Sequence, residues 1–209
     1  MCVNEEVSLA TFVVCMCTSV YLYKRNRKND RWISILFGYF GCMQIIEYMM
    51  WVDQECTGLN QLATTIGFWH TVLQPIVSLV VAYYFTNGLI PNWMFLLLGL
   101  YIVFSLPKIF EKKVEGVCSK PCNGSDGLAW EYTNTDSPIF VWGLFCLALA
   151  APLLTMKGNG RLFAGIIVGT YIASHFISIH RCPNASTAPN GSWWCLLSVI
   201  GSLTGVVVN

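Results

Sequence analysis

Long apolar runs with almost no charge are the feature that most constrains how this chain can fold. They recur near residues 7–23, 32–52, 61–85, 92–110, 138–156, 161–180 and 193–208. A helix rises about 1.5 Å per residue, so a bilayer core about 30 Å thick needs about 20 such residues. The first and last runs are at the short end of that range. The chain is predicted to be an all-α transmembrane helix bundle with about seven spans and a single domain over residues 1–209.

The charge content agrees with a lipid environment. Charged residues make up 11% of the chain and hydrophobic residues 55%, whereas about 25% charged residues are typical of a soluble domain. The net charge is +1, with no basic stripe outside one short loop, so a nucleic-acid partner is not expected. The expected partner is the lipid bilayer, and the oligomeric state is left open.

The distribution of basic residues predicts an orientation. Glu5 and Glu6 precede the first run, and a basic cluster follows it at Lys24, Arg25, Arg27, Lys28 and Arg31. A cleaved signal peptide has the reverse order, and basic residues favour the cytoplasmic side of a span. We therefore expect an uncleaved first span, the N-terminus outside and the C-terminus cytoplasmic, in a secretory-pathway, plasma or viral membrane.

The predicted outer loops contain glycosylation and disulfide candidates. Asn-x-Ser sequons begin at Asn123, Asn184 and Asn190. Four outer cysteines predict two disulfides whose three pairings stay open, with a four-thiolate zinc site as the alternative; they are Cys56, Cys118, Cys122 and Cys182. The longest outer loop, 111–137, is too polar to form its own core unless a disulfide closes it.

Small and aromatic residues predict how the helices pack. Gly165 and Gly169 in the sixth run, and Gly201 and Gly205 in the seventh, have the four-residue spacing that lets helices approach closely. Aromatic residues near the expected membrane boundaries are predicted to be interfacial anchors; they are Tyr21, Tyr23, Trp32, Trp51, Tyr83, Tyr84, Trp93, Trp130, Trp193 and Trp194.

Polar residues inside the second and third runs predict a site in the bundle interior. Gln44, Glu47, Tyr48 and Trp51 share one face of the second helix. On the third helix, a spacing of four and three residues predicts a polar stripe made of Asn60, Thr64, Gly67, Thr71, Gln74 and Ser78. His70 lies at the edge of this stripe.

A short loop joins these two helices, so their polar faces can meet. Pro75 frees the carbonyl of Thr71 from its helical hydrogen bond. We predict a polar centre for binding or proton relay, built around Glu47 and His70, with Gln74, Gln44, Tyr48 and Thr64 as further members. The alternative is that Glu47 is hydrated from outside and His70 is a packing residue.

Other classes of seven-span protein fit poorly. The predicted spans lack the lysine that a retinal protein needs and the periodic arginines of a voltage sensor. His70, His175, His180 and Asp53 are similar in type to the ligands of alkaline-ceramidase metal hydrolases. That family spaces its late histidines four apart, whereas His175 and His180 are five apart, about 140° around a helix. No metal or cofactor is predicted, and an enzyme is disfavoured.

Three segments resemble one family. They are the run from Glu47 to Asn60, the triplet Leu73-Gln74-Pro75 and the late Trp193-Trp194-Cys195. The pattern resembles uncharacterised multi-span proteins encoded by large DNA viruses of protists and by some hosts. The resemblance implies a shared seven-helix fold and a viral origin, and it implies no activity.

The function predicted from these observations is transport or sensing of a small solute or proton through the polar interior. The alternatives are a membrane-embedded metal-dependent hydrolase and a structural or receptor-like membrane or envelope protein.

Overall fold

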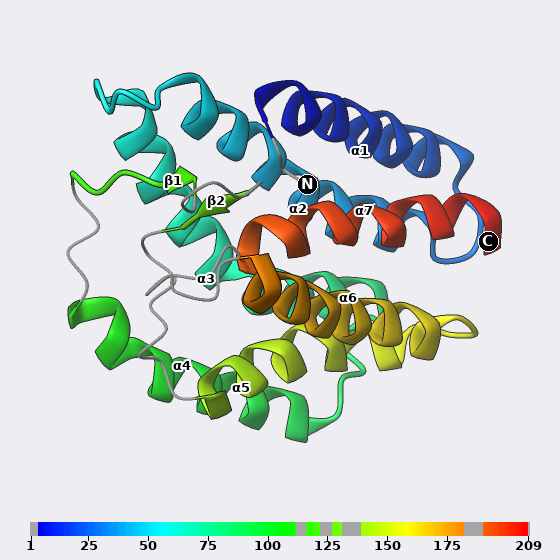
Figure 1. Cartoon of the computed structure of the whole chain (residues 1–209). Coiled ribbons are helices and arrows are strands. Elements are labelled where there is room, and N and C mark those ends of the chain that lie inside the picture. The colour runs from blue at the N-terminus through cyan, green and yellow to red at the C-terminus, as the bar shows by residue number, and fades with distance from the viewer. Residues whose placement is uncertain (1–3, 112–115, 122–126, 131–138, 182–189, 209) are drawn as a thin grey trace.

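The computed structural model describes residues 4–111, 116–121, 127–130, 139–181 and 190–208, and these residues form seven α-helices (Figure 1). The helices are α1 Glu5–Arg25, α2 Asp30–Val52, α3 Leu59–Phe85, α4 Asn92–Glu111, α5 Ile139–Ala150, α6 Gly160–Arg181 and α7 Asn190–Val208. A 3₁₀ helix, η1 Ala151–Thr155, extends α5, and β1 Lys120–Pro121 pairs antiparallel with β2 Leu128–Ala129. The predicted all-α class is confirmed. Six of the predicted apolar runs each coincide with one α-helix, and the run 138–156 covers α5 and η1.

Within the described ranges, four helical segments are long and apolar enough to cross a membrane; they are Glu5–Arg25, Asp30–Val52, Leu59–Phe85 and Gly160–Ile177. Shorter apolar helical segments occupy Asn92–Pro107, Phe140–Thr155 and Val199–Val208. The first helix is longer than its apolar run because Asn4 accepts a hydrogen bond from the Val7 amide and caps it. These lengths indicate a helical membrane protein.

Helix α2 is central, and it contacts α1, α3 and α7. Consecutive helices run in alternating directions (Figure 1). Large apolar side chains remain exposed on α3 and α4, including Val80 at 60%, Leu96 at 65% and Val103 at 62%. Exposed apolar side chains of this size on a helix bundle fit contact with lipid chains.

The two ends of the bundle differ in which segments lie there. At the hairpin end, the α2–α3 loop lies beside β1 and β2; at the basic end, the α1–α2 loop lies beside the C-terminus of α7 (Figure 1). The loop 111–137, expected to form no core of its own unless a disulfide closes it, contributes Leu128 and Trp130 to a buried cluster with Met43, Met50 and Phe68 from α2 and α3. The described part of this loop is therefore folded onto the bundle.

The glycine prediction is confirmed for α7, whereas no neighbour in the described part of this chain approaches the α6 glycines. A Cβ atom on Gly201 would overlap the Phe37 ring, and one on Gly205 would lie 2.9 Å from Ile33 Cγ2, so both glycines let α7 approach α2. Gly165 and Gly169 are exposed and have nothing within 4 Å of a built Cβ. Spacing alone identifies a smooth helix face but not whether a neighbour covers it.

The anchor prediction is wrong for three tryptophans. Trp130, Trp194 and Trp32 are 1%, 4% and 3% exposed. Trp32 stacks on Phe85, with ring centroids 5.8 Å apart, and the other two lie in the buried clusters. Burying a large ring between helices removes more apolar surface from water than an interfacial position does.

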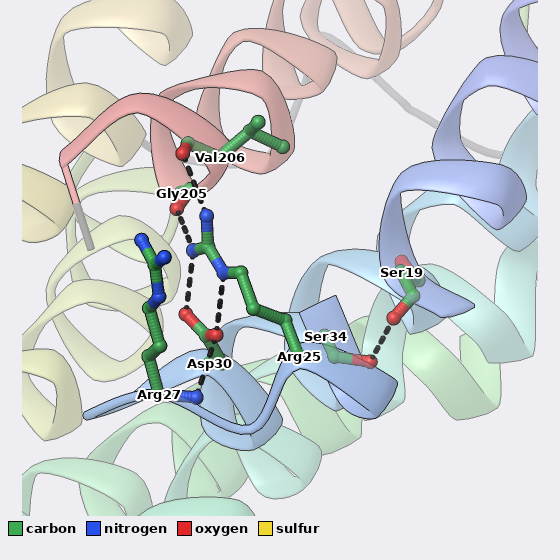
Figure 2. A network of polar contacts seen from close by, with 7 residues as sticks. All are labelled: Ser19, Arg25, Arg27, Asp30, Ser34, Gly205 and Val206. Carbon is green, nitrogen blue, oxygen red and sulfur yellow. Dashed lines mark hydrogen bonds and ion pairs between the residues drawn. The ribbon is translucent and has the colours of Figure 1, made fainter. Parts of the chain in front are cut away.

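A buried ion pair closes the basic end (Figure 2). The Arg25 guanidinium donates to both Asp30 carboxylate oxygens at 2.8 Å, and to the backbone carbonyls of Gly205 and Val206 at 2.8 Å. The Arg27 amide donates to the same carboxylate. Because the last carbonyls of a helix lack helical partners, Arg25 caps α7 while it holds the start of α2.

Candidate functional site

The polar stripe of α3 lies inside the bundle along its whole length. Asn60, Thr64 and Ser78 are fully buried, Gln74 is 1% exposed and Thr71 is 9% exposed. From Asn60 to Ser78 the stripe covers about 27 Å of helix, at about 1.5 Å per residue. The helix therefore carries a buried polar column nearly as long as a bilayer core is thick.

The α2–α3 loop fixes the column at the hairpin end. The Asp53 carboxylate accepts hydrogen bonds from the amides of Thr57, Gly58 and Asn60 and from the Thr57 hydroxyl, at 2.8–3.1 Å. These donors, the Asn60 and Thr57 amides first, lower the pKa of Asp53 to about 2. Asp53 is thus the cap of α3, and its oxygens are occupied by this role.

Asn60 joins three parts of the chain. Its side-chain nitrogen Nδ2 donates to the backbone carbonyls of Met50 and Ser119. Its side-chain oxygen Oδ1 accepts from the Ser119 backbone amide and the Thr64 hydroxyl. The hydroxyls of Thr64 and Ser119 lie 3.0 Å apart. The segment before β1 therefore pairs with the first polar turn of α3 and covers the column at this end.

Glu47 of α2 lies beneath the β1–β2 hairpin. Its side chain is fully buried, and Oε1 accepts a 3.1 Å hydrogen bond from the Trp130 indole nitrogen. Met43, Met50 and Phe68 belong to the apolar cluster that surrounds Trp130. This burial contradicts the alternative in which Glu47 is hydrated from the outer side, because the protein itself covers this carboxyl group.

His70 lies deeper and has a different partner. Its ring stacks on Tyr39 with centroids 4.3 Å apart, and Nε2 lies 2.9 Å from the Tyr39 carbonyl oxygen. The Tyr39 hydroxyl donates to the His70 carbonyl at 2.9 Å. The two residues therefore form a reciprocal clasp between α2 and α3.

The axial register accounts for this choice of partner. The bond from Asn60 to Met50 aligns those residues; at about 1.5 Å per residue, Glu47 then lies about 4.5 Å below them and His70 about 15 Å below them. Tyr39, about 16 Å below Met50 on α2, is level with His70. Glu47 and His70, whose polar faces the short loop allows to meet, instead have separate partners along one column, Trp130 and Tyr39.

Two buried acceptors in the middle of the column have no hydrogen-bond partner among the described residues. They are Nδ1 of His70 and Oε1 of Gln74, whose side chains are 8% and 1% exposed. The Tyr39 carbonyl can only accept, so the neutral His70 ring holds its hydrogen on Nε2 and leaves an acceptor lone pair on Nδ1. Because residues four apart share a helix face, both acceptors belong to the same side of α3.

The other predicted site residues lie nearby or elsewhere. Gln44 is fully buried on α2, and Tyr48 is half-buried. Ser78 closes the column toward the basic end by donating to the Leu149 carbonyl at 2.8 Å. His175 is exposed on α6. Among the described residues, no group of three or more His, Cys, Asp or Glu side chains is arranged to hold a metal ion.

The sequence-based prediction does not place Tyr39, Ser119 or Trp130 in the candidate site. Tyr39 has a usable signal: counting equal distances from a short loop along antiparallel helices pairs residue 70 with a position within about two residues of 41. Ser119 and Trp130 have none, because they come from a polar loop whose return to the bundle depends on tertiary contacts.

One predicted disulfide is present, between Cys56 of the α2–α3 loop and Cys118 beside the hairpin. Cys122 and Cys182, and the sequons at Asn123 and Asn184, lie outside the described residues. Asn190 is the first residue of α7. The disulfide resolves one of the pairings left open by the sequence.

Comparison with known proteins assigns a family to this architecture. No curated protein and no solved structure matches the chain. A model for a family of unknown function, DUF5765, matches residues 6–125, which extend from α1 past β1 and include the α3 column, Glu47 and both disulfide cysteines. That match identifies neither a viral source nor a number of spans. The chain belongs to the family DUF5765.

Proposed function

We propose that this protein is a seven-span membrane protein that relays protons or a small hydrogen-bond donor through the α3 column. The observation that carries the proposal is the pair of buried acceptors, His70 Nδ1 and Gln74 Oε1, in the middle of that column. Burying an acceptor without a partner costs free energy. A water molecule, a proton carrier or a small solute that donates hydrogen bonds would satisfy both.

Histidine chemistry makes a proton the preferred cargo. Neutral imidazole accepts a proton on Nδ1 while Nε2 keeps its hydrogen bond to Tyr39, so the ring can gain and lose charge without moving. The polar side chains on both sides of His70, from Asn60 to Ser78, are buried hydrogen-bonding groups that bridging water molecules can connect. Transport across the membrane additionally requires the hairpin end to open, because Ser119 and Trp130 cover it.

The test is proton flux into liposomes that contain the purified full chain, followed with an enclosed pH-sensitive dye. His70→Gln removes the titrating ring and should lower the flux about 100-fold, the contribution typical of a positioned proton-transfer group. Gln74→Leu removes one acceptor and should lower it about tenfold. His175→Gln, on the exposed face of α6, is the matched control and should leave the flux unchanged.

Glu47 gives a second readout of the same proposal. Glu47→Gln keeps an oxygen for the Trp130 hydrogen bond but removes the titratable group. If Glu47 admits protons to the column, this variant should transport without the pH dependence of the wild type between pH 5 and 8. Wild-type flux and wild-type pH dependence in all three variants would show that the column is structural.

The proposed orientation has its own experiment. With an outside N-terminus and seven crossings, a tag after residue 209 faces the cytoplasm and glycan attaches only at Asn123, Asn184 or Asn190. Antibody access to the C-terminal tag in intact cells would overturn the count of seven.

A further inference from the structure

A groove between α1 and α2 opens on the outside of the bundle, away from the α3 column. It holds about 330 Å³ and is lined by Val20, Tyr23 and Lys24 from α1 and by Ile35 and Cys42 from α2, among others. Its lining on α1 covers about 12 Å of helix between Met16 and Lys24, at about 1.5 Å per residue. The groove is thus a narrow apolar furrow between α1 and α2, which are both candidate membrane-spanning helices.

Side-chain size creates the groove. Gly38 forms part of its floor, and a Cβ atom there would lie 3.0 Å from the Ser19 hydroxyl oxygen. The two helices are tied at this level, because the Ser34 hydroxyl donates to the Ser19 carbonyl at 2.7 Å (Figure 2). Because Gly38 has no side chain and the Ser34 hydrogen bond holds the two helices together, a furrow is already formed between them. Val20 and Ile35 are exposed on its walls.

The groove ends in positive charge. Lys24 lines its end, and Arg31 lies one helical turn before Ile35 with its guanidinium 5.0 Å from the centre of the Tyr23 ring. Both cations are exposed. The one ion pair among the described residues uses Arg25 and Asp30, so the nearby carboxylate is already neutralised by another group.

Apolar walls with a cationic mouth match one class of occupant. An acyl chain fits the groove because its apolar walls are more favourably covered by hydrocarbon than by water. An anionic headgroup fits Lys24 and Arg31 at the bilayer surface. A peptide would need backbone hydrogen-bond partners along the furrow, and lipid supplies an acyl chain that needs none.

We propose that the α1–α2 groove is a binding site for an anionic phospholipid, with one acyl chain along Val20 and Ile35 and its phosphate at Lys24 and Arg31. The inference rests on the membrane placement proposed above and not on proton relay. Lipid binding and proton flux are separate measurements, so an absence of proton flux would leave the lipid site standing, and an absence of lipid preference would leave the proton relay standing.

The test is native mass spectrometry of the full chain in detergent, titrated with dioleoyl phosphatidylglycerol or dioleoyl phosphatidylcholine. We expect one phosphatidylglycerol to bind in preference to phosphatidylcholine. Each basic group near an anionic surface contributes about fivefold in affinity, so Lys24→Gln with Arg31→Gln should weaken binding about 25-fold. Soluble glycerol phosphate, which has no acyl chain, should not compete.

Two further variants separate the site from general attraction. Lys157→Gln with Arg161→Gln removes the same charge at the same end, since the Asn29 side chain donates to the Lys157 carbonyl, and should leave binding unchanged. Ile35→Trp fills the groove and should abolish preferential binding while both cations remain.

Equal loss in the Lys157 and Arg161 control, or full binding with the groove filled, would overturn the proposal. If the double substitution yields no folded protein, Lys24→Gln alone carries the test with a loss of about fivefold. Wild-type binding by that folded single variant would also contradict the assignment.

Discussion

The two ends of the bundle are closed by different means. At the basic end, a local ion pair five residues apart in sequence, Arg25 with Asp30, holds α1, α2 and α7 together. At the hairpin end, closure depends on contacts more than 50 residues apart, the Cys56–Cys118 disulfide and the bond from Trp130 to Glu47. One end is therefore held by a contact between helix termini with exposed cations around it, whereas the other is covered by a separate segment that packs over the polar column.

Removing the guanidinium should have the largest effect on stability. Arg25→Ala leaves the fully buried Asp30 carboxylate without its counter-charge and exposes two α7 carbonyls. Breaking a buried pair in this way costs about 3 to 5 kcal/mol. The measurement is thermal unfolding in detergent. Arg27→Ala is the matched control, since Arg27 bonds to Asp30 only through its backbone amide, and it should unfold like the wild type.

Opening the disulfide should come next and should act at the opposite end. Cys56→Ser with Cys118→Ser removes a cross-link between residues 62 positions apart, which typically contributes about 2 to 4 kcal/mol. The same protein should become sensitive to protease within 111–137 while the α1–α2 loop stays protected. Cys42→Ser, at a free half-buried cysteine, is the control. Equal protease sensitivity in both variants would mean that the cross-link does not hold this covering segment.

Removing the indole hydrogen bond should have a smaller effect. Trp130→Phe keeps a ring in the apolar cluster but withdraws the donor from Glu47 Oε1, at a cost of about 1 to 3 kcal/mol. Trp51→Phe is matched in chemistry, and its buried indole nitrogen has no partner in the described part of the chain, so it should cost less. Thermal unfolding of both variants distinguishes the hydrogen bond from ring packing, and equal losses would assign the effect to packing.

Acid should produce the smallest effect, through Asp53. Its folded-state pKa of about 2 is below the ordinary value of 3.8, so the charged carboxylate stabilises the fold above about pH 4 and this contribution is lost as the pH falls toward 2. Asp53→Asn should therefore lower the melting temperature at pH 6 and flatten its dependence on pH below 4. Glu55→Gln, at an exposed neighbour, should keep the wild-type profile.

The candidate site was predictable in its helix faces and not in its partners. Alternating steps of three and four placed Asn60, Thr64, Thr71, Gln74 and Ser78 on one side of α3, and all are buried. The short loop makes α2 and α3 neighbours, so contact between Glu47 and His70 was possible from the sequence. Whether two side chains are level depends on where the loop ends and the helices start, and that register is decided by the Asp53 cap and the Asn60 bonds.

Helix number and apolar character were determined by the sequence alone, because a run of about 20 apolar residues must satisfy its own backbone hydrogen bonds wherever it is buried. The buried positions of Trp130 and Trp32, the bare face of Gly165 and Gly169, and the pairing of Cys56 with Cys118 were decided only by the tertiary structure. Each depends on what a distant segment places opposite a residue. Periodicity reports the direction in which a side chain points along its own helix, and the neighbour it meets depends on how the whole bundle packs.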